Sequence, residues 1–252
     1  AASYNNVGFN LGAQGRAVEA EPFYRRALEI RERVLGVDHP DTAASYNNAG
    51  SNLGAQGRAR EAEPLLRRAL EIRERVLGVD HPDTATSYNN AGANLDAQGR
   101  ATEAEPFYLR ALEIVERVLG ADHPHTAASY NNAGANLDAQ GRAAEAESFY
   151  RRALDIRERV LGVDHPDTAK SYNNVGFNLD AQGRATEAEP FYLRALEIVE
   201  RVLGADHPHT ATCYNNVGFN LDAQGRAAEA EPFYRRALEL RASGGDHHGT
   251  EA

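Results

Sequence analysis

The sequence predicts an all-α solenoid of six two-helix repeats, and two observations predict it. Residues 1–42 recur five more times with few changes, so blocks of 42 residues account for all 252 positions. A fixed period of about 20–50 residues is typical of repeat architectures. Inside each block, two stretches place apolar residues at spacings of three and four, which is the pattern of an amphipathic helix. The six repeats are 1–42, 43–84, 85–126, 127–168, 169–210 and 211–252.

The first helix of the block is predicted from its apolar stripe and ends at a glycine. The stripe is formed by Tyr4, Val7, Gly8 and Leu11, and Gly15 follows it. Asparagine and glycine, which are poor helix formers, are frequent in this stretch. We therefore expect packing between helices to hold this helix, and we expect an isolated repeat not to fold.

The second helix is predicted from Ala17 to Leu35. Its buried stripe consists of Ala20, Tyr24, Ala27, Leu28 and Leu35. Pro22 falls four or five residues into this helix, where proline removes a backbone hydrogen bond. Either the helix begins later than Ala17, or it bends at Pro22. The recurrent acids Glu19 and Glu21 are expected on a solvated face.

The linker 36–42 is predicted to end one helix and to start the next. Gly36 supplies a C-terminal cap, and Pro40 lies in the first turn of the following helix. Either Asp38 or His39 is the N-cap. Each repeat is therefore predicted to be two antiparallel helices joined by a short turn.

The composition disfavours some classes of binding partner and indicates a cellular location. The formal net charge of −10 opposes attraction to nucleic acid or to an anionic membrane surface. No stretch approaches the roughly 20 apolar residues of a spanning helix. The single cysteine, Cys213, cannot form an internal disulfide, so we expect a reducing, cytoplasmic location. The chain begins within the repeat register and contains no methionine, so we expect it to be part of a longer protein.

Two sets of motifs carry a family resemblance. The pattern Tyr4, Val7-Gly8, Leu11, Gly15, Ala20, Tyr24 and Ala27-Leu28 resembles the tetratricopeptide repeat (TPR). The 42-residue period and the motifs Tyr4-Asn5-Asn6, Glu19-Ala20-Glu21-Pro22, Ala27-Leu28-Glu29-Ile30-Arg31-Glu32 and Asp38-His39-Pro40-Asp41 resemble the kinesin-light-chain type of this repeat. The resemblance implies a right-handed superhelix whose first helices line a concave groove that holds peptides or partner proteins.

Three positions of the first helix vary among the repeats, while the Tyr4, Gly8 and Leu11 positions do not. We call the six residues at one repeat position a column. The position-2 column is Ala2, Ala44, Thr86, Ala128, Lys170 and Thr212. The position-9 column is Phe9, Ser51, Ala93, Ala135, Phe177 and Phe219. The position-12 column is Gly12, Gly54, Asp96, Asp138, Asp180 and Asp222. Repeats that stack identically but contact a non-repeating ligand should differ at the positions that line the groove. Drift among duplicated repeats is the alternative explanation.

Two asparagine columns are invariant. The position-5 column is Asn5, Asn47, Asn89, Asn131, Asn173 and Asn215, and the position-6 column is Asn6, Asn48, Asn90, Asn132, Asn174 and Asn216. A carboxamide both donates and accepts, so it can pair with any peptide backbone. We expect the position-5 column to grip an extended ligand and the position-6 column to bond neighbouring repeats. Bonding between repeats is the alternative for the position-5 column, and ligand binding is the alternative for the position-6 column.

Charge and size in the groove predict features of the ligand. The four aspartates of the position-12 column favour a basic ligand whose binding weakens with salt. Lys170 alone is too few cations for a clamp on a C-terminal carboxylate. The missing rings at Ser51, Ala93 and Ala135 leave room for a bulky ligand side chain.

Chemistry-bearing residues do not form a catalytic or metal site in this pattern. The histidine pairs are His123 with His125, His207 with His209 and His247 with His248, whereas metal sites need three or four ligands. Histidine also recurs in every linker, as a turn or cap residue does. An active site is singular, but each candidate acid is copied in nearly every repeat. We therefore expect no enzyme activity, no cofactor and no metal.

Repeats three and five share a second set of substitutions. Leu109 and Leu193 replace arginine, Val115 and Val199 replace arginine, and His125 and His209 replace aspartate. These residues mark either apolar patches on the convex side or copying of a two-repeat block, and we prefer the copying.

The predicted function is a non-catalytic scaffold that binds an extended peptide or partner segment. The alternatives are a structural, self-assembling module, or the sensor region of a larger signalling NTPase. The array is predicted over 1–241 and a disordered tail over 242–252. Because no amphipathic helix caps the last repeat, self-association through the ends is a further expectation.

Overall fold

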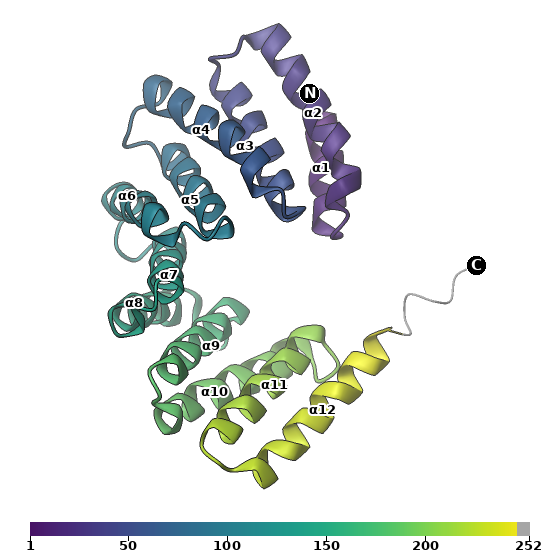
Figure 1. Cartoon of the computed structure of the whole chain (residues 1–252), viewed down its shortest axis with the longest axis vertical. Helices are drawn as coiled ribbons and strands as arrows, with labels where there is room; N and C mark the ends of the chain where they lie inside the picture. The colour runs from purple at the N-terminus through teal and green to yellow at the C-terminus, as the bar shows by residue number, and fades with distance from the viewer. Residues whose placement is uncertain (246–252) are drawn as a thin grey trace, which may run out of the picture. The chain divides into compact units, whose positions relative to one another are not determined.

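The computed structural model describes residues 1–245, which form 12 α-helices joined by short turns (Figure 1). The helices are α1 (Ala2–Ala13), α2 (Ala17–Leu35), α3 (Pro40–Ala55), α4 (Ala59–Val76), α5 (Pro82–Ala97), α6 (Ala101–Leu119), α7 (Pro124–Ala139), α8 (Ala143–Leu161), α9 (Pro166–Ala181), α10 (Ala185–Leu203), α11 (Pro208–Ala223) and α12 (Ala227–Gly245). The predicted six helix pairs are confirmed.

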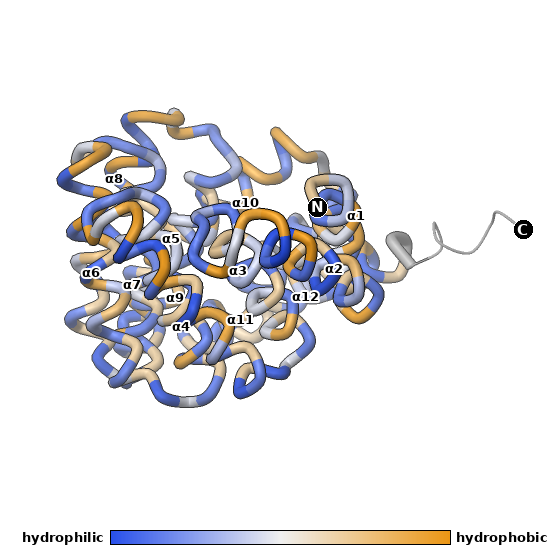
Figure 2. The backbone as a smooth tube through the Cα atoms, turned by 90° about the horizontal axis from the view of Figure 1, so that it is seen from above, coloured by the Kyte–Doolittle hydropathy of each residue, from blue (hydrophilic) through white to orange (hydrophobic). Residues whose placement is uncertain are grey.

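The helices group into two compact units, residues 1–121 with α1–α6 and the rest of the chain with α7–α12. Within each unit, every helix packs on the next one along the chain. In addition, α3 contacts α5, and α9 contacts α11. The first helices of neighbouring repeats therefore lie together and form one side of each unit, which we call the first-helix face. Hydrophilic and hydrophobic residues both occur along the helices (Figure 2), as the amphipathic pattern requires.

Backbone hydrogen bonds explain where the helices begin and end. The Arg16 N–H donates to the Leu11 carbonyl at 3.0 Å, and Gly15 closes the turn with a φ of +75°. This conformation favours glycine, which is why α1 ends here. At the start of α3, Nδ1 of His39 accepts from the Asp41 N–H at 3.1 Å. His39, and not Asp38, is therefore the N-cap, and His81, His123, His165 and His207 repeat this contact.

Pro22 lies inside α2, which begins at Ala17 as predicted. A later helix start is therefore excluded. Helix α8 has Ser148 at this position and the corresponding bounds, so the proline does not determine the helix boundaries. Pro22 and Val18 are both exposed. Water can therefore hydrogen-bond the Val18 carbonyl, which has lost its helical donor.

Tight contacts at the position-8 glycines and fully buried isoleucines form the core. A Cβ added at Gly134 would lie 3.2 Å from the ring of Tyr150, and one at Gly176 would lie 3.0 Å from Tyr192. The second helix therefore packs directly on the backbone of the first. Ile156 and Ile198 are fully buried in the core.

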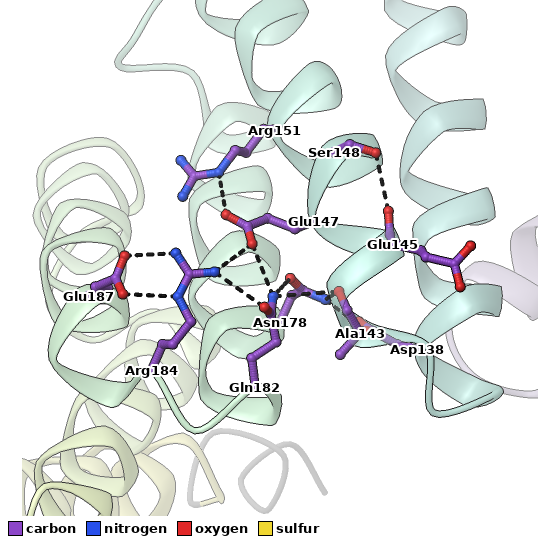
Figure 3. Close-up of polar contacts among 10 residues, drawn as sticks. All are labelled: Asp138, Ala143, Glu145, Glu147, Ser148, Arg151, Asn178, Gln182, Arg184 and Glu187. Atoms are coloured by element: carbon purple, nitrogen blue, oxygen red, sulfur yellow. Dashed lines mark hydrogen bonds and ion pairs between the residues drawn. The ribbon is translucent and has the colours of Figure 1, made fainter.

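A network of polar bonds joins consecutive repeats, as Figure 3 shows for α8–α10. The carboxylate of Glu147 accepts from Arg184 at 2.6 Å, from Gln182 at 3.1 Å and from Arg151 at 2.7 Å. The equivalent Glu21 accepts from Arg58 at 2.6 Å, and only 18% of its side chain is exposed. The expectation that Glu21 lies on a solvated face is therefore wrong, because the next repeat covers it.

Glu147→Gln should weaken the fall in stability at low pH. Burial opposes ionisation of Glu147, but the bonds from Arg151, Gln182 and Arg184 together hold its pKa below the ordinary value. A depressed folded pKa contributes stability above the ordinary carboxyl pKa and loses it as the pH falls through the folded pKa. Asp138, whose pKa is raised by burial, acts in the opposite direction and is unchanged in this variant.

Thermal unfolding followed by circular dichroism between about pH 7 and 3 measures this effect. The variant should start with a lower midpoint at pH 7 and should lose less on acidification than the parent chain. Glu187→Gln, which alters only the ion pair of Glu187 with Arg184 within one repeat, should change the midpoint less. Equal curves for Glu147→Gln and the parent chain would contradict the prediction.

No helix in residues 1–245 has the length and apolar character to cross a membrane. The last helix, α12, extends to Gly245, so the tail predicted from residue 242 begins within this helix. The remaining tail residues, His247 and His248 among them, lie outside the described part of the chain.

Candidate peptide-binding face

The structure places the variable columns on the first-helix face. The exposed fractions of Phe9, Phe177 and Phe219 are 70%, 61% and 58%. Ser51, Ala93 and Ala135 are also exposed at the same position. Lys170 of the position-2 column is exposed as well. Among the predicted aspartates, Asp222 is exposed, whereas Asp96, Asp138 and Asp180 are half-buried.

The two asparagine columns bond to each other between repeats. Asn48 donates its Nδ2 to Oδ1 of Asn5 at 2.7 Å, and Asn90 donates to Asn47 at 3.0 Å. In the second unit the same bond joins Asn174 to Asn131 and, at 3.3 Å, Asn216 to Asn173. The predicted inter-repeat role of the position-6 column is confirmed. Asn5, Asn47, Asn131 and Asn173 of the position-5 column accept in this bond through Oδ1. Asn47 is only 6% exposed, so it offers little surface to a ligand. Asn89 interacts within the chain, and Asn215 is half-buried.

The position-12 aspartates form hydrogen bonds inside the array. Oδ1 of Asp138 accepts from Asn178 of the next repeat at 2.8 Å, and Oδ1 of Asp180 accepts from Asn220 at 2.8 Å. Oδ2 of Asp222 accepts from Tyr234 at 2.9 Å. These bonds direct the carboxylates of Asp138, Asp180 and Asp222 toward the array instead of a ligand.

A cavity of about 570 Å³ lies between α9, α10 and α11 in the second unit. Lys170, Asn173 and Thr212, which belong to the position-2 and position-5 columns, form its rim. Val199, Leu203 and Cys213 form its apolar floor. Asn173 also donates to the sulfur of the buried Cys213 at 3.4 Å, and burial raises the pKa of this thiol. The site therefore favours an apolar group with a polar attachment.

The cavity exists because one arginine is missing. One repeat earlier, Arg157 fills the equivalent space and donates to Oγ of Ser171 at 2.7 Å and to the Asp167 carbonyl at 3.3 Å. Val199 stands in place of this arginine, and it is only 5% exposed. Val199 therefore lies between repeats, so it forms no patch on the convex side. His209 and Cys213 replace the aspartate and the serine in the same cavity.

A second cavity, of about 320 Å³, opens on the first-helix face of the first unit. Ser51 and Gly54 of α3, Leu66 of α4, and Ala93 and Asn94 of α5 line it. Ser51 and Ala93 are two of the three residues that replace phenylalanine, and the sequence predicts room for a ligand side chain beside them.

Acids and histidines do not gather into a metal site in the described residues, where no group of three or more suitable side chains is close enough. The rings of His123 and His125 lie 5.1 Å apart, and His123 serves as a helix cap.

The tetratricopeptide repeat model matches residues 1–75, 50–108, 97–159, 139–192 and 167–243, which together cover most of the chain. The chain belongs to the tetratricopeptide repeat family. No curated protein matches this tetratricopeptide array in sequence.

Solved structures of similar fold cover most of the tetratricopeptide array. The kinesin light chain TPR-like repeats of Podosopora anserina are 22% identical, with a TM-score of 0.72 over 81% of this chain and 97% of that chain. BtubC (BKLC) from P. vanneervenii is 22% identical, with a TM-score of 0.73 over 96% and 94%. A Rap protein complexed with competence and sporulation factor is 17% identical, with a TM-score of 0.67 over 95% and 74%. At these identities the likeness shows the fold.

Proposed function

We propose that this tetratricopeptide array is a non-catalytic scaffold that binds an extended peptide on its first-helix face. The observation that carries the proposal is the cavity of about 570 Å³, whose rim contains Lys170 and Asn173 and whose floor is apolar. Such a cavity suits one bulky apolar side chain of a ligand. The similar Rap protein complexed with competence and sporulation factor adds support by analogy of fold.

The rest of the face suits the neighbouring residues of the same peptide. The side-chain amides of the half-buried Asn5, Asn131 and Asn215 can donate to backbone carbonyls whatever the ligand's sequence. Phe177 and Phe219, more than half exposed, lie on the first helices beside the cavity and can pack on ligand side chains. Affinity should therefore depend mostly on the anchor in the cavity.

Filling the cavity with the chain's own residues tests this proposal. In the double variant Val199→Arg with His209→Asp, the new arginine should occupy the cavity as Arg157 does beside Asp167. A peptide selected by phage display against the parent chain should bind the variant at least about tenfold more weakly. Isothermal titration calorimetry measures the affinity, and the thermal midpoint should not fall.

Leu193→Arg is the matched control, because it restores arginine on an exposed part of α10 that does not line the cavity. Its affinity for the selected peptide should equal that of the parent chain. Undiminished binding by the double variant would reject the cavity as the anchor.

A further inference from the structure

A third asparagine column, at position 10, supplies hydrogen bonds between neighbouring repeats of the second unit. Asn178 donates to the Ala143 carbonyl and to Asp138 forty residues earlier, at 2.8 Å in both cases. Asn220 bonds the Ala185 carbonyl and Asp180 at the same distances. In both cases the acceptor is the position-12 aspartate of the preceding repeat, 40 residues before the asparagine.

At position 12 the first two repeats have glycine instead of aspartate, and the asparagines in the corresponding register are Asn52 of repeat two and Asn94 of repeat three. Asn52 and Asn94 stand forty residues after Gly12 and Gly54, as Asn178 stands after Asp138. Asn52 is only 6% exposed, and its Nδ2 has no hydrogen-bond partner among the described residues. Asn94 is 5% exposed and keeps the bond to the Ala59 carbonyl at 2.8 Å. An unsatisfied buried donor costs free energy, so an acceptor supplied from outside would be favourable.

Space is present where the two carboxylates are missing. A Cβ at Gly54 would meet no atom within 4 Å, and Gly54 and Asn94 both line the cavity of about 320 Å³. At Gly12, an added Cβ would lie 3.9 Å from the hydroxyl of Tyr24. In the last repeat the equivalent Tyr234 donates to Asp222. The tyrosine hydroxyl that holds the aspartate in the last repeat is therefore present beside Gly12.

Charge is also distributed so that these repeats tolerate an acid. Residues 1–84 contain 11 arginines and 12 acidic residues, so they are nearly neutral. Residues 85–252 contain 16 basic and 25 acidic residues and hold most of the net charge of −10. An acidic ligand segment is repelled least at the first two repeats.

We propose that repeats one and two bind two side-chain carboxylates of an acidic peptide in the places where later repeats hold their own aspartates. This inference rests on the proposed peptide-binding function and names the ligand chemistry of one part of the face. Neighbouring repeats lie about 10 Å apart, which matches roughly three residues of extended chain. The preferred segment therefore has acidic residues at positions i and i+3.

The probe is an acetylated, amidated peptide that contains Asp-Ala-Ala-Asp, compared with its Asn-Ala-Ala-Asn counterpart. Binding is followed through the side-chain amide signals of Asn52 and Asn94 in ¹H–¹⁵N NMR spectra of the whole chain. The acidic peptide should shift both signals and should bind at least about tenfold more tightly, because charged acceptors form the stronger hydrogen bonds. The asparagine peptide with a free C-terminal carboxylate should remain weak. If it binds as tightly as the acidic peptide, the proposed side-chain source is wrong.

The double variant Gly12→Asp with Gly54→Asp should lose the preference for the acidic peptide, because its own carboxylates then occupy both places. The double variant Ala13→Asp with Ala55→Asp adds the same charge at exposed neighbouring positions and should keep the preference. Equal binding of the two amidated peptides, no binding of either, or an unchanged preference in the first variant would each overturn this proposal. The double variant Val199→Arg with His209→Asp tests the proposed peptide-binding function independently.

Discussion

Replacing Gly176 by leucine should lower the free energy of unfolding of the second unit by about 3 kcal/mol. The Cβ alone would lie 3.0 Å from the ring of Tyr192, which is only 2% exposed and has little room to move. The remaining atoms of leucine would force α9 and α10 apart and would disturb the packing around Ile198. Urea denaturation followed by circular dichroism and by tyrosine fluorescence measures the loss.

Gly54→Leu is the matched control, because a Cβ at Gly54 meets no atom within 4 Å. Leucine is the better helix former by about 0.8 kcal/mol, so the control should be neutral or slightly stabilising. An equal cost for the two variants would show that the contact with Tyr192 does not explain the invariant position-8 glycines.

Replacing Asn178 by alanine should cost about 2–3 kcal/mol, because it removes hydrogen bonds to a charged and to a neutral acceptor. Asn178 is fully buried, and it bonds both the Ala143 carbonyl and the carboxylate of Asp138. The substitution would leave both acceptors without this donor between two repeats. Because solenoid repeats are stabilised through their interfaces, the second unit should also unfold less cooperatively. Hydrogen exchange of the α7–α10 amides measures that loss along with the equilibrium stability.

Asn52→Ala provides the internal control for this prediction. The Nδ2 group of Asn52 has no partner among residues 1–245, so its removal costs less than about 1 kcal/mol. If Asn52→Ala is as destabilising as Asn178→Ala, the hydrogen bonds of Asn178 to Asp138 and to the Ala143 carbonyl are not the source of the effect.

The helices and their ends were predictable because they depend on local pattern. The stripe around Tyr24 and Ala27 gives the buried side of the second helix, and the glycines and the linker histidines cap the ends. These features involve residues within a few positions of each other, so backbone preference and periodicity decide them.

The meaning of invariance and variation within the columns was harder to predict. The position-10 asparagines are as invariant as those of positions 5 and 6, yet only the register of 40 residues shows that Asn178 reaches Asp138. From the sequence alone, the change from Gly12 to Asp138 at one repeat position suggests contact with a ligand. The carboxylate of Asp138 instead bonds Asn178 of the next repeat. A single sequence does not distinguish a neighbouring repeat from a ligand, because either partner can constrain a surface column in the same way.

The sequence alone determined the repeat period, the 12 helices, the family and the face on which binding is proposed, because each follows from residues that recur at fixed spacing. Only the tertiary structure decided that Val199, His209 and Cys213 line one cavity and that Nδ2 of Asn52 has no hydrogen-bond partner among residues 1–245, whereas Asn178 has two. Those groups meet across an interface between repeats, where shape and hydrogen bonding depend on the distance between two helices and not on the order of residues within either one.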